Sequence, residues 1–252
     1  MFIFKIAIII VLGSFIGWFI GILVYRLPRR ISVFSSSTCD YCNSKLRFVN
    51  KIPILGYILS SGKCSNCLRK IPYYYILIEI LTPCLFIGLY LEFGFSLLFF
   101  QYSLLTFLCI TIFFTDLFHR IIPDVLTLPF LISGLLFSFW NNLGLIESIK
   151  GFISGSAIFI IIAILYKMIT KKEGLGGGDI KLVAMVGSFL GFKLTFFTIF
   201  LSSFLGMIII YISKHYSKMP VPFGSFIVVA TYISILFGNQ IIELYLNLWG
   251  VS

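Results

Sequence analysis

Apolar residues in this chain form long uninterrupted runs, and polar residues are concentrated in short segments between them. An α-helix needs about 20 apolar residues to cross a bilayer core about 30 Å thick. Eight apolar runs near this length lie at about 3–25, 73–91, 95–115, 125–140, 152–170, 180–192, 194–213 and 224–247. Two of them, 125–140 and 180–192, are short for a full crossing. The pattern predicts an all-α integral membrane protein with about eight transmembrane helices.

Composition supports a membrane protein. The chain has 252 residues, of which 60% are hydrophobic and 11% charged, whereas soluble domains are about 45–50% apolar and about 25% charged. The first run is longer than the apolar region of an ordinary signal peptide, and no small-residue cleavage site follows it. We therefore expect residues 1–25 to be a retained first transmembrane helix.

The basic residues are distributed unevenly between the two sides of such a helix array. If the N-terminus lies outside, the segments 26–72, 116–124, 167–181 and 214–223 share one side and carry sixteen of the nineteen Lys and Arg residues. The positive-inside rule places that side in the cytoplasm. The net charge of +10 is thus mainly a topology signal, and we expect the lipid bilayer and no nucleic acid as a partner.

Residues 26–72 form the longest polar segment and contain two C-x-x-C pairs, Cys39 with Cys42 and Cys64 with Cys67. Two such turns can present four thiolates to one tetrahedral Zn²⁺, which leaves no open position for catalysis. So short a segment has little apolar core of its own, and metal binding would supply the free energy to fold it. We expect a structural zinc site; disulfides or free thiols are the alternative, less suited to a reducing cytoplasm.

Acidic residues are scarce, and two of them fall at helix ends on the same expected membrane face. Asp116 ends the third apolar run and Asp179 begins the sixth. Two neighbouring carboxylates share a proton, so that one can activate water while the other polarises a carbonyl, as in aspartic proteases. We therefore expect Asp116 and Asp179 to form a catalytic dyad.

Three glycines next to this pair and two other carboxylates, Glu79 and Asp124, are also candidate site residues. Gly176, Gly177 and Gly178 precede Asp179 and would allow a peptide backbone to approach or unusual φ and ψ angles to form; an ordinary linker before a helix capped by Asp179 is the alternative. Glu79 lies inside the second apolar run and should face a partner or a substrate.

Another carboxylate, Asp124, follows Pro123. It is expected to cap the helix that begins there or to meet the basic leader of a substrate.

These motifs together resemble the prepilin peptidases, the type IV leader peptidases that process pilin-like precursors. The family's Gly-x-Gly-Asp motif matches residues 176–179, and its Asp-x5-(Ile/Leu)-Pro-Asp pattern matches Asp116 through Asp124. "GSFIGWFIGILVYRLPRR", the cysteine pairs and "PVPFGSF" also follow the family order. Gly17 stands where the family commonly has Asn, and Ser225 where Pro often follows "PFG". We expect neither of them to touch the dyad.

The resemblance implies a membrane aspartic endopeptidase of the bacterial inner membrane. It would cleave type IV prepilins or pseudopilins after a glycine at the cytoplasmic face, and would methylate the new N-terminus with S-adenosylmethionine. The expected organisation is a first helix (1–25), a cytoplasmic four-Cys segment (26–72) and a transmembrane peptidase domain (73–252).

Three other functions are consistent with parts of the sequence. A transporter or channel also uses intramembrane acids, but usually near the bilayer midplane and often in repeated halves, and no internal repeat is present here. A non-enzymatic assembly protein would tolerate loss of both aspartates. An enzyme that only transfers methyl groups would not need them.

Overall fold

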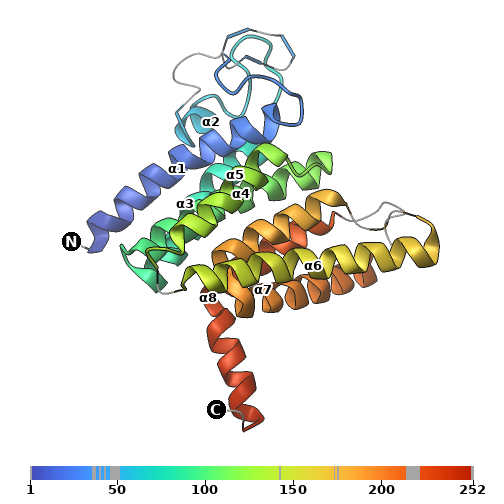
Figure 1. Ribbon diagram of the computed structural model, residues 1–252. Helices are drawn as coiled ribbons and strands as arrows, with labels where there is room; N and C mark the ends of the chain where they lie inside the picture. The colour runs from blue at the N-terminus through green and yellow to red at the C-terminus, as the bar shows by residue number, and fades with distance from the viewer. Residues whose placement is uncertain are drawn as a thin grey trace. The chain divides into compact units, whose positions relative to one another are not determined.

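Helices form every named element in the part of the chain that this computed structural model describes, which is residues 2–35, 38–39, 41–42, 44–45, 52–141, 143–172, 174, 176–213 and 222–250. In chain order these helices (Figure 1) are α1 Phe2–Arg26, α2 Leu55–Leu59, α3 Tyr74–Phe93, α4 Leu97–His119, α5 Asp124–Phe137, α6 Leu145–Thr170, α7 Gly177–Ser213 and α8 Phe223–Leu248. The described residues contain two isolated β-bridges but no β-strand. The expected all-α fold is confirmed. The expected loop at 214–223 lies largely outside the described residues.

Six of these helices, α1, α3, α4, α6, α7 and α8, are long and apolar enough to cross a membrane. All eight apolar runs of the sequence are helical, but they do not all form separate long helices. The run at 125–140 corresponds to α5, which has only 14 residues. The runs at 180–192 and 194–213 both lie within α7.

The two apolar runs within α7 are separated by a break at Gly191, where φ is 73° and ψ is 179°. This conformation is accessible almost only to glycine. The chain reverses there, and the segments 177–190 and 192–213 run in opposite directions (Figure 1). The expected division between the two runs is therefore present, as one sharp turn without a loop.

Contacts near the two ends of α7 agree with this reversal. Gly178 and Gly206 would lie about 40 Å apart in one straight helix at ~1.5 Å per residue. Instead, a Cβ on Gly178 would lie 3.0 Å from Ile122, whose side chain also approaches Gly224. A Cβ on Gly206 would lie 3.6 Å from Phe223, the residue before Gly224. Both ends of α7 therefore meet the start of α8.

The break at Gly191 leaves carbonyl groups of the preceding turn without their usual helical partners. Gln101 of α4 is fully buried and donates from Nε2 to the Phe189 carbonyl at 3.2 Å. The Ser148 hydroxyl of α6 donates to the Ser188 carbonyl. Because an unsatisfied carbonyl within a bilayer costs several kcal/mol, these two side chains offset the cost of the turn.

By its contacts, the chain divides into the units Met1–Leu91 and Glu92–Ser252. In the first unit, α1 and α3 approach closely along Gly13 and Gly17. A Cβ on Gly13 would lie 2.8 Å from the Cα of Pro83, and a Cβ on Gly17 would lie 2.8 Å from the Cα of Glu79. Glycines thus join two helices within one chain, and an asparagine at position 17 would require α1 to move away from α3. The expected functional division at residue 72 stays a prediction, since this partition reflects contacts alone.

The second unit contains α4 to α8, and α6 packs directly on α7. Gly151 and Gly187 face each other so closely that a Cβ on either would collide with the backbone of the other helix. Phe189 and Met185 of α7 are fully buried. The first half of α7, which begins with the glycine-rich motif, is therefore held firmly within this unit.

Candidate active site and metal centre

Asp116 lies in the last turn of α4 and is buried, with 6% of its surface exposed. Its Oδ2 accepts a hydrogen bond from the backbone N–H of Ser225 at 2.9 Å, and the Ser225 hydroxyl lies 3.3 Å from the same oxygen. Gly224 makes this approach possible, because a Cβ there would lie 2.8 Å from Oδ2. Our expectation that Ser225 does not touch the dyad is wrong.

The start of α8 explains why Asp116 is bound there. Pro222 is the N-cap residue, so Ser225 is the third residue of the helix. The first N–H groups of a helix have no partner within it and attract negative charge. A carboxylate from α4 supplies the missing acceptor from outside. The α8 N-terminus and the Asp116 side chain thus fix each other's position.

Asp179 is the third residue of α7 and is partly exposed. Its backbone N–H donates to the Gly176 carbonyl at 3.1 Å. It lies close enough to Asp116 for the two carboxylates to interact electrostatically. The structure therefore brings together the two aspartates that the sequence placed at one expected membrane face.

The three glycines before Asp179 differ in their surroundings. A Cβ on Gly178 would lie 3.0 Å from the Cβ of Ile122, and one on Gly176 would lie 3.3 Å from Asp179 Oδ2. A Cβ on Gly177 would have no atom of the described residues within 4 Å. None of the three has a positive φ. Close approach, rather than an unusual backbone conformation, therefore accounts for two of the three glycines.

Asp124 is the first residue of α5, and Pro123 occupies the N-cap position. The expectation that Asp124 caps this helix is therefore wrong. Its two carboxylate oxygens instead accept hydrogen bonds from Lys181 Nζ at 2.7 and 2.8 Å. This partly exposed ion pair connects the first turn of α5 to the first turn of α7, two residues after Asp179.

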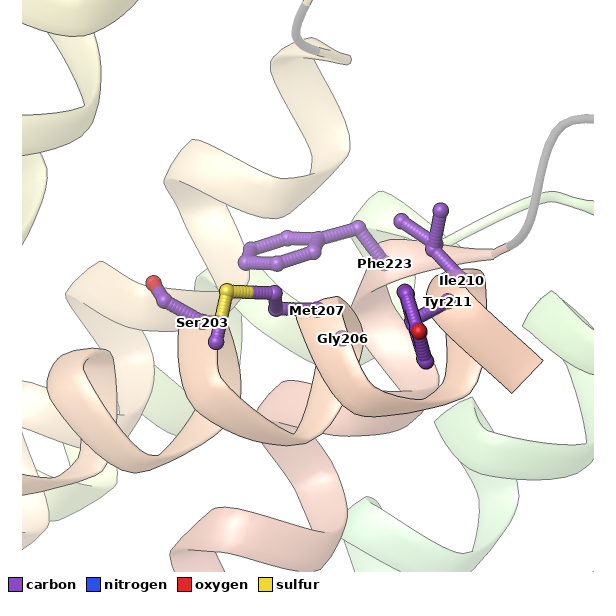
Figure 2. A pocket seen from close by; sticks show the side chains of 6 residues that line it. All are labelled: Ser203, Gly206, Met207, Ile210, Tyr211 and Phe223. Carbon is purple, nitrogen blue, oxygen red and sulfur yellow. The ribbon is translucent and has the colours of Figure 1, made fainter. Parts of the chain in front are cut away.

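An open groove with a volume of about 480 Å³ lies beside the start of α8. Figure 2 shows the Phe223 ring lying across the part of α7 that carries Gly206 and Met207. The other lining residues are Ser203, Ile210 and Tyr211. The groove is mainly apolar and begins next to Gly224, which contacts Asp116.

Glu79 lies in α3, within the first unit, and is buried. One of its carboxylate oxygens accepts a hydrogen bond of 2.6 Å from the backbone N–H of Ile54. Ile54 precedes the short helix α2 and has a positive φ of 60°. The buried carboxylate thus has a local partner in the polar segment between α1 and α3.

The four cysteine sulphurs of the polar segment lie within 4.8 Å of one another. Cys39 and Cys67 are 3.7 Å apart, and Cys42 and Cys64 are 4.0 Å apart. A disulfide bond would require about 2.05 Å. Tetrahedral Zn²⁺ with Zn–S bonds of about 2.3 Å separates its sulphurs by about 3.8 Å. The donor set therefore fits zinc and excludes disulfide pairing in this arrangement.

Hydrogen bonds favour thiolates at two of the four positions. The Ser44 hydroxyl, 3.0 Å from the Cys42 sulphur, lowers the pKa of that thiol to about 6. The backbone N–H groups of Cys67 and Asn66 lower the pKa of Cys64. The Arg69 N–H favours the Cys67 thiolate, but burial and the other three sulphurs raise the pKa of Cys67 to about 11. Four thiolates at this spacing need a compensating cation.

Sequence reasoning missed Ser225, Gly224 and Lys181 as neighbours of the acidic groups. The "PFGS" stretch was noted only as a motif, although it begins a helix on the expected side of the membrane. Lys181 lies two residues after Asp179 and so at the same helix end. The expected topology could have placed Ser225, Gly224 and Lys181 at the same membrane face as the two aspartates. It could not specify which of their atoms are in contact.

Two family models match the chain. The bacterial Peptidase A24 N-terminal domain matches residues 11–93, and the type IV leader peptidase family matches residues 103–211. The prepilin leader peptidase/N-methyltransferase of Pseudomonas aeruginosa is 32% identical over 274 residues, which cover 96% of this chain and 93% of the relative. The protein of the same name in Bacillus subtilis is 29% identical over 252 residues, covering 97% and 99%. No solved structure matches the chain.

Proposed function

Because the chain belongs to the type IV leader peptidase family, we propose that it is a membrane endopeptidase that removes the leader from type IV prepilins or pseudopilins. The observation that carries this proposal is that Asp116 and Asp179 lie at the same end of the second unit. There Ile122 lies against both Gly178, the residue before Asp179, and Gly224, which contacts Asp116. Family membership alone identifies the class of enzyme. The geometry supports the two groups that would perform the cleavage.

In the proposed reaction, Asp116 and Asp179 share one proton, because two close carboxylates do not both ionise easily. The ionised carboxylate takes a proton from water as the oxygen attacks the scissile carbonyl carbon. The protonated carboxyl donates to the carbonyl oxygen. Collapse of the tetrahedral intermediate breaks the C–N bond, and the departing amine receives a proton from the dyad.

The surroundings of the dyad suit a substrate that continues as an apolar helix. The groove beside Phe223 begins next to Gly224 and extends along α7 from Tyr211 to Ser203. Its length is about two helical turns, or ~12 Å. The open side of Gly177 offers space near Asp179 for an extended peptide. Cleavage after a glycine would place the bond where the helix leaves the bilayer.

Other acidic residues would support the site without taking part in the chemistry. We propose that Asp124 holds the first turn of α7, and therefore Asp179, through its ion pair with Lys181. In the first unit, Glu79 would fix the polar segment through Ile54. Neither role requires contact with the bond that is cleaved.

We also propose that the protein methylates the new N-terminus, as the names of its relatives state for them. S-adenosylmethionine would supply the methyl group when bound. Cys39, Cys42, Cys64 and Cys67 would hold a structural Zn²⁺, which supplies the cross-link for folding the polar segment.

The proposed placement is a multi-pass protein of the bacterial inner membrane, with the N-terminus outside and the dyad facing the cytoplasm. The uneven distribution of Lys and Arg supports this orientation. Water is available at that face, so hydrolysis does not need to occur within the hydrocarbon core.

The decisive experiment incubates the purified protein with a prepilin and S-adenosylmethionine, and identifies the product's N-terminus by mass spectrometry. We expect cleavage after glycine by the wild type and none by Asp179→Asn or Asp116→Asn, and Asp179→Asn should leave the unfolding temperature unchanged. Glu147→Gln, which neutralises an exposed acid of α6 outside the dyad, is the matched control and should retain the wild-type activity. Full cleavage by either dyad variant would contradict the proposal.

A further inference from the structure

We propose that the polar segment between α1 and α3 binds anionic lipid at the membrane surface. The apolar face of α2 lies against acyl chains, and two lysines, Lys63 and Lys70, contact lipid phosphates. The proposed orientation makes this the cytoplasmic leaflet. The contact belongs to the first unit and takes no part in prepilin cleavage, so it goes beyond the proposed function.

The exposed face of the short helix α2 is apolar. Leu55, Ile58 and Leu59 are 55%, 59% and 68% exposed, and residues three and four apart lie on one side of a helix. The ring of Tyr57 packs inward, where it would lie 2.9 Å from a Cβ on Gly62. The helix is thus attached to the rest of the segment on one side. On the other side it offers an apolar face of the kind that contacts lipid or protein.

A hydrogen bond fixes the depth of α2 relative to the membrane. The backbone N–H of Ile54, the residue before α2, donates to a Glu79 carboxylate oxygen at 2.6 Å. Glu79 is the sixth residue of α3, so it lies about 7.5 Å along that helix from Tyr74. Interfacial helices bury their apolar face about 5–10 Å into the boundary between headgroups and acyl chains. The start of α2 therefore lies at a depth where lipid can cover its apolar face.

Two lysines lie directly opposite each other in the same part of the segment. Lys63 and Lys70 form an isolated antiparallel β-bridge, and both are exposed. Side chains paired in this way point to the same side, with Cβ atoms about 4.5–5.5 Å apart, and like charges there repel. Among the described residues, neither lysine has an acidic partner. A lipid phosphate bound between them would offset the repulsion.

The lysine pair and α2 form one local structure. The Tyr57 hydroxyl lies 3.5 Å from the carbonyl oxygen of Ile71, the residue after Lys70. The Ile71 N–H donates to the carbonyl of Gly62, the residue before Lys63, at 2.8 Å. Tyr57 therefore connects α2 to both ends of the lysine bridge. The depth of α2 brings Lys63 and Lys70 near the headgroups.

Charge selects lipid as the occupant of this surface. Residues 26–72 contain nine Lys or Arg and one acidic residue, and anionic lipids attract basic segments next to a membrane-spanning helix. The two flanking helices, α1 and α3, are both long and apolar enough to cross the membrane, so the bilayer surface is always adjacent. The leader of the proposed substrate is itself basic and would be repelled.

A single tryptophan in α2 can report which lipid lies beside it. The three native tryptophans are replaced by Phe and Leu59→Trp is introduced. The full chain is then reconstituted in nanodiscs that contain phosphatidylglycerol and phosphatidylcholine in equal amounts. Bromine on the acyl chains of one lipid or of the other quenches the reporter only at close range. We expect phosphatidylglycerol to be preferred about tenfold, which is within the effect of two lysines near an anionic surface.

Charge variants separate the lysine pair from basic charge in general. Lys63→Gln combined with Lys70→Gln should reduce the preference to about twofold or less. Lys171→Gln combined with Lys172→Gln, a matched pair exposed directly after α6 in the second unit, should leave it unchanged. In detergent, the first double variant should not unfold at a lower temperature than the wild type, because it removes a repulsion.

Each result has a definite consequence. The inference is overturned if neither lipid quenches the reporter, since α2 then lies outside the bilayer, or if both quench it equally. A preference that survives the loss of both lysines would overturn their assignment. If the double variant does not fold, Lys70→Gln alone decides, with an expected preference of about threefold. Prepilin cleavage is not measured, so failure of the proposed function would leave these outcomes unaffected.

Discussion

The two aspartates at the proposed active site have different surroundings. Asp116 is buried and hydrogen-bonded to the start of α8, whereas Asp179 is partly exposed beside a run of glycines. Two chemically identical groups are therefore constrained to different degrees. Asp116 is held by a neighbouring helix, while Asp179 depends on the position of its own first turn.

That dependence leads to a prediction about the ion pair between Asp124 and Lys181. Lys181→Asp should lower kcat for cleavage about threefold to tenfold, because like charges would separate the first turns of α5 and α7. Combining it with Asp124→Lys should restore most of the rate by recreating the pair in reverse. The measurement is prepilin cleavage by the single and double variants.

The matched control reverses another exposed ion pair, Lys150 with Glu147, which are 2.7 Å apart in α6. Its single and double variants should cleave at the wild-type rate. If the Lys181 and Asp124 reversals have independent, additive effects, the ion pair does not position Asp179.

At the scale of elements, the reversal in α7 is the feature on which the site most depends. It brings the start of α7 and the start of α8 to the same end of the unit. The break needs three coordinated features: a glycine at the turn, a glutamine on α4 and a serine on α6. Two of these lie far from Gly191 in sequence.

Replacing the turn glycine should destabilise the protein. Gly191→Ala would place a side chain at φ 73° and within 2.7 Å of Leu143, at a cost of about 1–3 kcal/mol. Thermal unfolding in detergent should therefore occur at a clearly lower temperature. Gly177→Ala is the control, because that position has open space. Equal unfolding temperatures for the two variants would contradict this account of the turn.

At the scale of the whole molecule, the metal site and the dyad belong to different units, Met1–Leu91 and Glu92–Ser252. The four cysteines of the cluster and Glu79 are in the first, and Asp116, Asp179 and Ser225 are in the second. A disturbance of the metal site should therefore affect the first unit before it affects cleavage.

Metal analysis can test this separation. We expect about one zinc per purified chain, which a strong chelator or Cys64→Ser should remove because a four-thiolate site needs every ligand. Cleavage of the same prepilin should largely persist, because Asp116 and Asp179 belong to the other unit. Cys84→Ser is the control, since Cys84 is exposed and outside the cluster. Unchanged zinc content in Cys64→Ser would contradict the proposed site.

Much of this organisation could be predicted from the sequence because its signals are local. Run length predicted the helices, and cysteine spacing predicted the cluster of sulphurs. The alternation of membrane crossings along the chain predicted that Asp116 and Asp179 would lie at one membrane face. The partners of Gly191, Asp116 and Asp124 were not predictable in this way. Gln101, Ser225 and Lys181 are ordinary residues in sequence, and only tertiary packing selects the atoms that they contact.

The contact between Asp116 and α8 also matters for anyone who wishes to trap an uncleaved precursor on the enzyme. An inactive protein is useful for that purpose only if its shape is preserved. Altering Asp116 disturbs an acceptor that the α8 N-terminus uses, so it risks changing the groove beside Phe223 at the same time. In the part of the chain that the structure describes, Asp179 makes no hydrogen bond to α8, so Asp179→Asn is the better starting point for capturing the bound complex.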